Sequence, residues 1–157
     1  MTLFPFIERN DGLASLLATL VTLAFAYYEY QRAQRLEKAR TIEPARAALI
    51  LIDPIVKALQ GASGANDETA VNMSIVTATT VAKRHQDILR SISGLPPNAE
   101  LMFALASVAE ATRNVVNYLG ADRVLEEWSL QQKQQGCASR LHEFQAYAPA
   151  LKKFAGV

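Results

Sequence analysis

The residues whose types could do chemistry in this chain are His85, Cys137 and His142. His85 lies on an apolar stripe between Ala82 and Leu89, where a buried imidazole needs a partner for its ring nitrogens. A metal ion or haem could be such a partner, which makes His85 a candidate cofactor ligand. No second ligand follows at the i+3 or i+4 position, so the sequence favours an imidazole bonded to protein groups.

Cys137 and His142 could form a catalytic pair only through tertiary folding, because a spacing of five does not place them on one helical face. Cys137 falls in the apolar phase of its segment, so we expect a buried structural thiol. The chain contains no GxSxG, P-loop, HExxH or CxxC motif. We therefore predict a protein that is not an enzyme, with no catalytic residues, no metal and no cofactor.

Trp128 is the single tryptophan and precedes the glutamine-rich run Gln131–Gln135. Its apolar neighbours Val124, Leu125 and Leu130 favour a place in the core. A protein contact is the alternative, since tryptophan often anchors interfaces and the glutamines could form a polar contact face beside it.

An uncharged run of 17 residues, Gly12 to Tyr28, dominates the amino-terminal part. This length reaches the lower limit for a helix that crosses a bilayer. We predict a short leader over 1–11 and a single transmembrane helix over 12–30. A cleaved signal peptide, with a small-x-small motif at Ala24–Ala26, and a buried core helix are the alternatives.

Charged residues around the apolar run predict its orientation. Five basic residues follow the run, whereas Arg9 alone precedes it. Basic residues directly after an apolar helix resist translocation, which also argues against a signal peptide. We expect an inner (plasma) membrane protein with its amino terminus outside and its carboxyl-terminal domain in the cytoplasm. The five residues are Arg32, Arg35, Lys38, Arg40 and Arg46.

Two further patterns fit a membrane helix. Aromatic and basic side chains at both ends could lie at the membrane interface; they are Phe4, Phe6, Tyr27, Tyr28, Tyr30, Arg32 and Arg35. Small side chains recur every fourth residue and could pack against another membrane helix; they are Ala14, Ala18, Thr22 and Ala26. The expected partners are the lipid bilayer and either other membrane subunits or a second copy of this helix.

The remaining sequence predicts an all-α domain. A charged helical stalk over 31–42 would lead into a bundle of four to five antiparallel helices over 43–157. The net charge of +1 offers no basic surface for nucleic acid, and a single cysteine excludes an internal disulfide. Thr41 could cap a new helix with Pro44 in its first turn, and Pro54 should kink or break that helix.

Apolar stripes at helical spacing mark the next two helices. The first would start at Asn66 or Asp67, and its stripe is Val71, Ile75, Ala78, Ala82, His85, Leu89 and Ile92. The second stripe is Leu101, Leu105, Val108, Thr112, Val115 and Leu119. We expect Gly120 to end this helix in a left-handed conformation. A fourth helix, capped by Asp122, would stop at Gly136, before a last helix that carries Cys137 and Phe144.

The leading functional hypothesis is a non-enzymatic single-pass membrane protein that acts as an accessory, assembly or scaffolding subunit of a membrane complex. The first alternative is a self-associating, membrane-anchored signalling or effector protein that pairs through the small residues of its membrane helix. The second alternative is a cofactor-binding bundle that uses His85.

Overall fold

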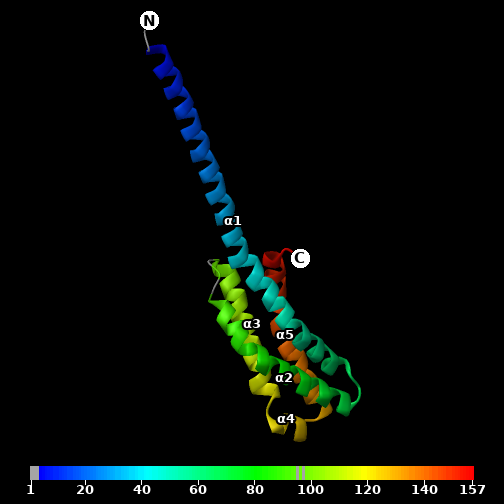
Figure 1. Ribbon diagram of the computed structural model, residues 1–157. Coiled ribbons are helices and arrows are strands. Elements are labelled where there is room, and N and C mark those ends of the chain that lie inside the picture. Colours follow the sequence, from blue (N-terminus) through cyan, green and yellow to red (C-terminus); the bar gives the residue numbers. More distant parts are fainter. Residues whose placement is uncertain (1–3, 95, 97) are drawn as a thin grey trace. The chain divides into compact units, whose positions relative to one another are not determined.

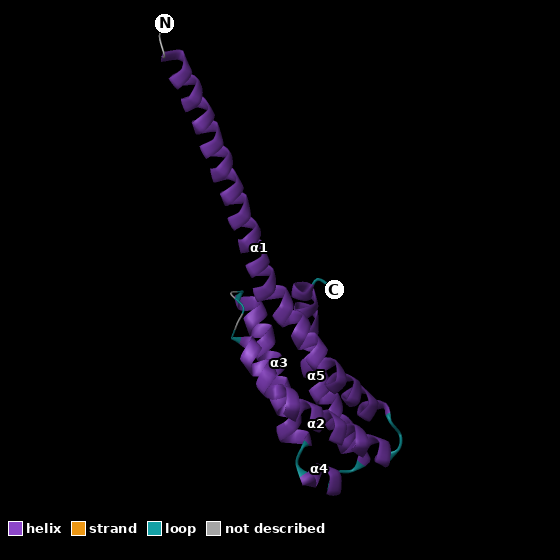
Figure 2. Ribbon diagram, viewed as in Figure 1, coloured by secondary structure: helices purple, strands orange, loops and turns teal. Residues whose placement is uncertain are grey.

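The structure is a computed structural model of the chain. It describes the backbone of residues 4–94, 96 and 98–157, and the side chains from Leu16 onward except those of 95 and 97. Within these residues the chain is all-α and contains no strand, which confirms the predicted fold class of a helical bundle (Figures 1 and 2). The helices are α1 (Phe4–Gly64), α2 (Glu68–Ser93), α3 (Ala99–Leu119), α4 (Asp122–Glu126) and α5 (Leu130–Ala155).

Helix α1 is continuous from Phe4 to Gly64 and contains both Pro44 and Pro54. The prediction that Thr41 caps a new helix is therefore wrong, and Pro54 does not end the helix. Each proline removes one backbone donor, which costs about 3 kcal/mol in a helix interior. A stripe of buried apolar residues, spaced alternately three and four positions apart, offsets that cost. The stripe is Ala45, Ala48, Ile52, Ile55, Leu59 and Ala62.

Helices α2 and α3 begin at side-chain caps. Asp67 Oδ2 accepts a hydrogen bond from the N–H of Ala70, and Asn98 Oδ1 accepts one from the N–H of Leu101. The predicted stripe of α3 is buried at all six positions, and that of α2 is buried at all but His85 and Ile92, which are half-buried. These two predicted helices are confirmed. They lie side by side, and both pack against α5 (Figure 1).

The predicted left-handed conformation of Gly120 is wrong, because its φ is −83°. Close approach explains the glycine: an added Cβ would lie 2.4 Å from the carbonyl oxygen of Val116. The predicted fourth helix is also wrong in its extent. Helix α4 begins without a side-chain cap after Ala121, ends at Glu126, and is followed by α5, which runs through Gly136 to Ala155.

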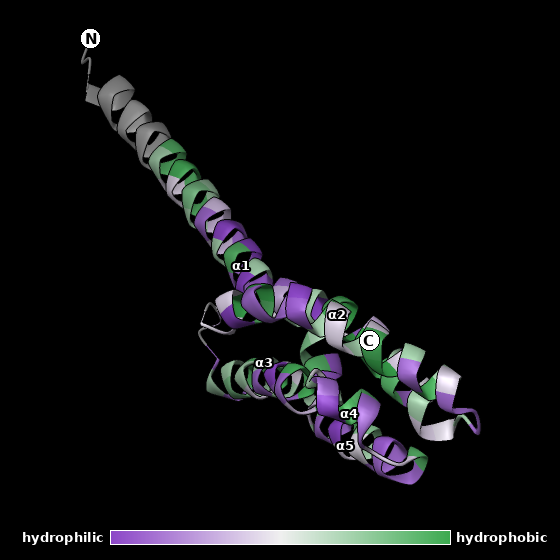
Figure 3. Cartoon of the chain, turned by 90° about the horizontal axis from the view of Figure 1, so that it is seen from below, coloured by the Kyte–Doolittle hydropathy of each residue, from purple (hydrophilic) through white to green (hydrophobic). Residues whose placement is uncertain are grey.

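The chain divides into two compact units, Met1–Lys38 and Ala39–Val157. The boundary falls inside the predicted charged stalk (31–42). Apolar residues gather in the early described turns of α1, and polar residues follow them (Figure 3). In the part of the chain that the structure describes, no helix combines the length and apolarity needed to cross a membrane. The transmembrane helix over 12–30 is thus not confirmed, and the side chains of 12–15 lie outside the described residues.

Candidate functional site: a groove beside Trp128

Trp128 lies in the short connection between α4 and α5, where it is half-buried rather than enclosed in the core. Its ring packs on Gly136, one of the early residues of α5. A Cβ at Gly136 would lie 2.8 Å from Cζ3 of the indole and 3.3 Å from Cδ2 of Leu119. Gly136 is therefore a packing residue inside a helix, and its missing side chain leaves the space that the indole occupies.

A surface groove opens beside the indole, between α3 and the first half of α5. Its lining combines aromatic, amide and guanidinium side chains; the residues are Tyr118, Leu119, Trp128, Gln132, Gln135, Gly136, Ser139 and Arg140. The glutamines that follow Trp128 in sequence thus lie on the same surface as the indole. We call this surface the Trp128 groove.

Arg140 is held in place at the α3 side of the Trp128 groove. Its guanidinium carbon lies 4.8 Å from the ring centroid of Tyr118, within the range of a cation–π contact. Nη1 of Arg140 is 2.5 Å from Oε1 of Glu143, and Nδ2 of Asn114 donates to Oε2 of the same carboxylate. Because Glu143 pairs with Arg140, the guanidinium group at this side of the groove carries no unpaired charge.

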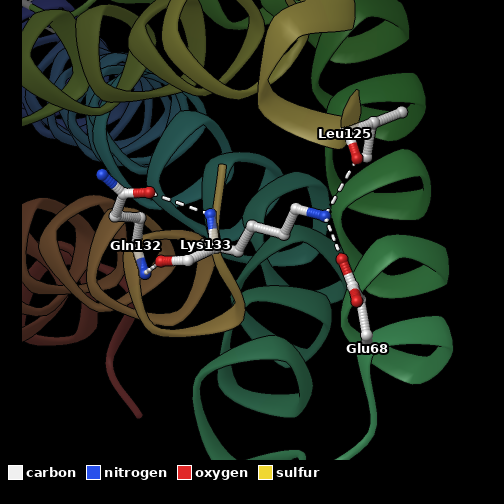
Figure 4. Close-up of polar contacts among 5 residues, drawn as sticks. Glu68, Leu125, Gln132 and Lys133 are labelled. Atoms are coloured by element: carbon white, nitrogen blue, oxygen red, sulfur yellow. Dashed lines mark hydrogen bonds and ion pairs between the residues drawn. The ribbon is translucent and has the colours of Figure 1, made fainter. Parts of the chain in front are cut away.

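Two sets of polar contacts, drawn in Figure 4, fix the backbone before and after Trp128 in the sequence. Ser129 and Gln132 form a capping box at the start of α5: the Ser129 hydroxyl accepts from the Gln132 N–H, and Gln132 Oε1 accepts from the Ser129 N–H. Lys133 Nζ donates to the Leu125 carbonyl at 2.9 Å and pairs with Glu68 Oε1 at 2.8 Å. These contacts tie α4 and α5 to the first turn of α2.

Lys133 is fully buried, and sequence reasoning missed it because the glutamine-rich run around it was interpreted as a polar contact face. The helical spacing between Lys133 and the apolar residues that follow it could have revealed its burial. Lys133 precedes Cys137 by four positions, Phe144 by eleven and Leu151 by eighteen, which places it on the same buried stripe. A lysine in that phase needs an anionic or carbonyl partner, and both are present here.

His85 lies partly buried on α2, and its Nδ1 is 2.8 Å from the carbonyl oxygen of Leu51 in α1. A carbonyl can only accept, so Nδ1 carries the proton in this contact. Pro54 has no N–H, so the carbonyl of Ile50 lacks its usual helical hydrogen bond. The acceptor Leu51 is the next residue. His85 thus joins α2 to a proline-containing turn of α1. No cluster of three metal-ligating side chains occurs among the described residues.

Cys137 is buried and His142 is exposed, and the structure records no hydrogen bond between them. Burial raises the pKa of the Cys137 thiol from 9.0 to about 11. A thiol with a raised pKa is a poor nucleophile near neutral pH, because the thiolate is the reactive species. The environment of Cys137 therefore suits a packing role.

The described side chains of the predicted membrane segment are exposed, including Ala18, Thr22 and Ala26. The Thr22 hydroxyl donates to the carbonyl of Ala18 within the same helix. At the expected interface, Gln31 and Gln34 donate to the hydroxyls of Tyr27 and Tyr30, and exposed Tyr28, Arg32 and Arg35 complete the described part of that set. Phe4, Phe6 and Ala14 have side chains outside the described residues.

No protein-family model, curated protein or solved structure matches this chain.

Proposed function

We propose that the protein is a non-enzymatic, membrane-tethered accessory or scaffolding subunit. The amino-terminal helix crosses the membrane once, with the amino terminus outside. The bundle lies at the cytoplasmic face and contacts another subunit of a membrane complex.

The exposed apolar side chains in the described turns of α1 carry this proposal. Neighbouring positions such as Leu16 and Leu17, or Leu20 and Val21, are exposed although they point to different sides of the helix. A helix that is apolar all round is stable when other apolar material covers it. Acyl chains supply such a cover, and the uncharged run that begins at Gly12 gives the segment the necessary length.

The Trp128 groove is the proposed contact with the other subunit. Tryptophan, tyrosine and arginine are the residues that most often dominate binding energy at interfaces, and the groove brings Trp128, Tyr118 and Arg140 together. With Arg140 neutralised by Glu143, the groove suits an uncharged peptide segment. Such a segment would place one apolar side chain on the rings and its backbone against the amides of Gln132 and Gln135.

The membrane part of the proposal is tested by one pair of substitutions. Val21→Arg places a charge in the apolar run, whereas Ile50→Arg changes an equally exposed apolar residue of the bundle; Val21 is 68% and Ile50 72% exposed. A central arginine costs roughly 3 kcal/mol on insertion. We expect Val21→Arg to reduce the membrane fraction of tagged protein and Ile50→Arg to leave it unchanged. Wild-type protein in the soluble fraction would refute the tether.

The contact part is tested by affinity purification from membranes in mild detergent. A stoichiometric second subunit that is lost with Trp128→Ala and kept with Tyr147→Ala would support it. Tyr147 is a half-buried aromatic residue of α5 that does not line the groove. Retention of the subunit by Trp128→Ala would assign the contact to another surface.

A further inference from the structure

The outward sides of α2 and α3 form a second surface, separate in its lining from the Trp128 groove. On α2, exposed residues recur at steps of three and four along one face; the large or charged ones are Met73, Val76, Lys83, Asp87 and Arg90. On α3 a neighbouring exposed stripe contains Glu110 and Arg113. Phe103 is exposed as well, but its ring packs edge-on against Tyr147 of α5, so it lies outside this face. We call these two stripes the α2/α3 face.

Parts of the two stripes line one groove. Asp87 and Arg90 of α2 line it together with Glu110 and Arg113 of α3. The floor contains Ala106 and Ala109, whose small side chains leave the groove open. These four charged residues therefore form one patch rather than two unrelated edges.

The order of residues along this face has a definite polarity. Because α2 and α3 are antiparallel neighbours, Lys83 lies at the level of Arg113, and Asp87 at the level of Glu110. Apolar Met73 and Val76 lie beyond the two cations, toward the start of α2. The order along the face is therefore apolar, cationic and anionic, with Arg90 as an additional cation toward the end of α2.

We propose that a second copy of this chain covers the α2/α3 face through a two-fold axis. A two-fold interface requires a surface that is complementary to itself when turned end for end. In that arrangement α2 lies along the partner's α2 and α3 along its α3, so Lys83 meets the partner's Asp87 and Arg113 meets the partner's Glu110. Arg90 falls opposite the level of Thr80, an uncharged position. Complementary charge fixes the register, and the exposed apolar side chains supply buried area.

This dimer rests on the bundle and does not depend on the membrane tether. The Glu110 carboxylate already holds Arg113 at 2.7 Å within one chain. An exposed i,i+3 pair of this kind contributes little to stability, so its charges are available to a partner at low cost.

Charge reversal in two complementary variants tests the dimer. The variant Asp87→Lys/Glu110→Lys makes both pairs positive, and Lys83→Glu/Arg113→Glu makes both negative. We expect each variant alone to dissociate at least tenfold more readily than the wild type, because its like pairs oppose each other. An equimolar mixture should form a mixed dimer. Glu126→Lys/Glu127→Lys, at exposed sites outside the face, makes the same charge change as the positive variant; it is the matched control for that variant and should dimerise normally.

The measurement is sedimentation equilibrium of the full chain in mild detergent over a concentration series. Circular dichroism of each variant checks that the helices are retained. Val76→Ser, at an exposed apolar position of the face, provides a second variant and should also weaken the dimer. A wild type that stays monomeric, a dimer that neither charge variant weakens, or two variants that fail to combine would each overturn the proposal. A dimer insensitive to charge but lost with Ala18→Leu/Thr22→Leu would instead assign self-association to α1.

Discussion

The two units of the chain differ in what surrounds their apolar side chains. In Ala39–Val157, leucine, isoleucine and valine side chains at helical spacing are enclosed by neighbouring helices. In the described part of Met1–Lys38, similar side chains are exposed on every side of one helix. Burial of apolar surface stabilises the bundle through its own contacts. The described apolar side chains of the amino-terminal unit gain no such burial within the chain, and we propose that lipid covers them.

The largest expected effect comes from one leucine in each unit. Leu105 is fully buried in α3, whereas Leu20 is 59% exposed in α1. Leu105→Ala should lower the free energy of unfolding of the bundle by about 3 kcal/mol, because it removes buried methyl groups and leaves a cavity. Leu20→Ala should change it by less than about 0.5 kcal/mol. Urea unfolding followed by circular dichroism measures both. Equal losses would show that the two units share one core.

The contrast between the units explains which features of the fold the sequence could predict. The stripes of α2 and α3 were readable because packing repeats at the period of a helix. The continuity of α1 through Pro44 and Pro54 was not readable, since local rules place a helix start or a kink at each proline. Tertiary burial of residues such as Ile52 and Leu59 outweighs that local preference. Long-range packing is not visible in a single sequence.

The next largest effect tests how the bundle accommodates a buried charge. Lys133 is fully buried, but the Glu68 side chain is 59% exposed. Glu68→Ala leaves the ammonium with the Leu125 carbonyl as its recorded partner, so we expect a loss of about 2–3 kcal/mol. Lys133→Met leaves a carboxylate that water can solvate and should cost about 1 kcal/mol. The two unfolding free energies give the comparison, and a larger loss for Lys133→Met would contradict this account.

The Trp128 groove was predictable in part. Trp128 and the glutamines beside it were recognisable as a possible contact surface from their types and proximity. Tyr118 and Arg140 were not, because they come from α3 and α5 and meet only through the fold. Gly136 was misread as a helix end, since the space needed by an indole ring is a tertiary requirement that no local pattern encodes.

The third effect concerns Cys137. Burial raises the pKa of its thiol to about 11. Between pH 9 and 11 the unfolded chain loses the thiol proton while the folded chain keeps it. Fewer protons on the unfolded state mean that stability falls as the pH rises. From pH 9 to pH 10 we expect a loss of about 1 kcal/mol from this group. The comparison is with Cys137→Ala, in which that component of the pH dependence should be absent. Identical pH profiles would show that burial does not raise the pKa of Cys137.

The smallest effect distinguishes two glycines inside helices of the bundle. At Gly61 an added Cβ would meet the Ser74 Oγ at 3.5 Å, an ordinary contact, so Gly61→Ala should raise stability by about 0.5–1 kcal/mol through helix propensity. At Gly136 the same change gains that propensity but forces the Trp128 ring to move, which costs about 1–3 kcal/mol. We therefore expect a net loss near 1 kcal/mol, together with a change in tryptophan fluorescence that Gly61→Ala does not produce. Combining Gly136→Ala with Trp128→Ala should remove the clash, so the double variant should be more stable than the sum of its single changes. If the two changes are simply additive, the indole does not depend on the missing side chain, and the Trp128 groove is formed in some other way.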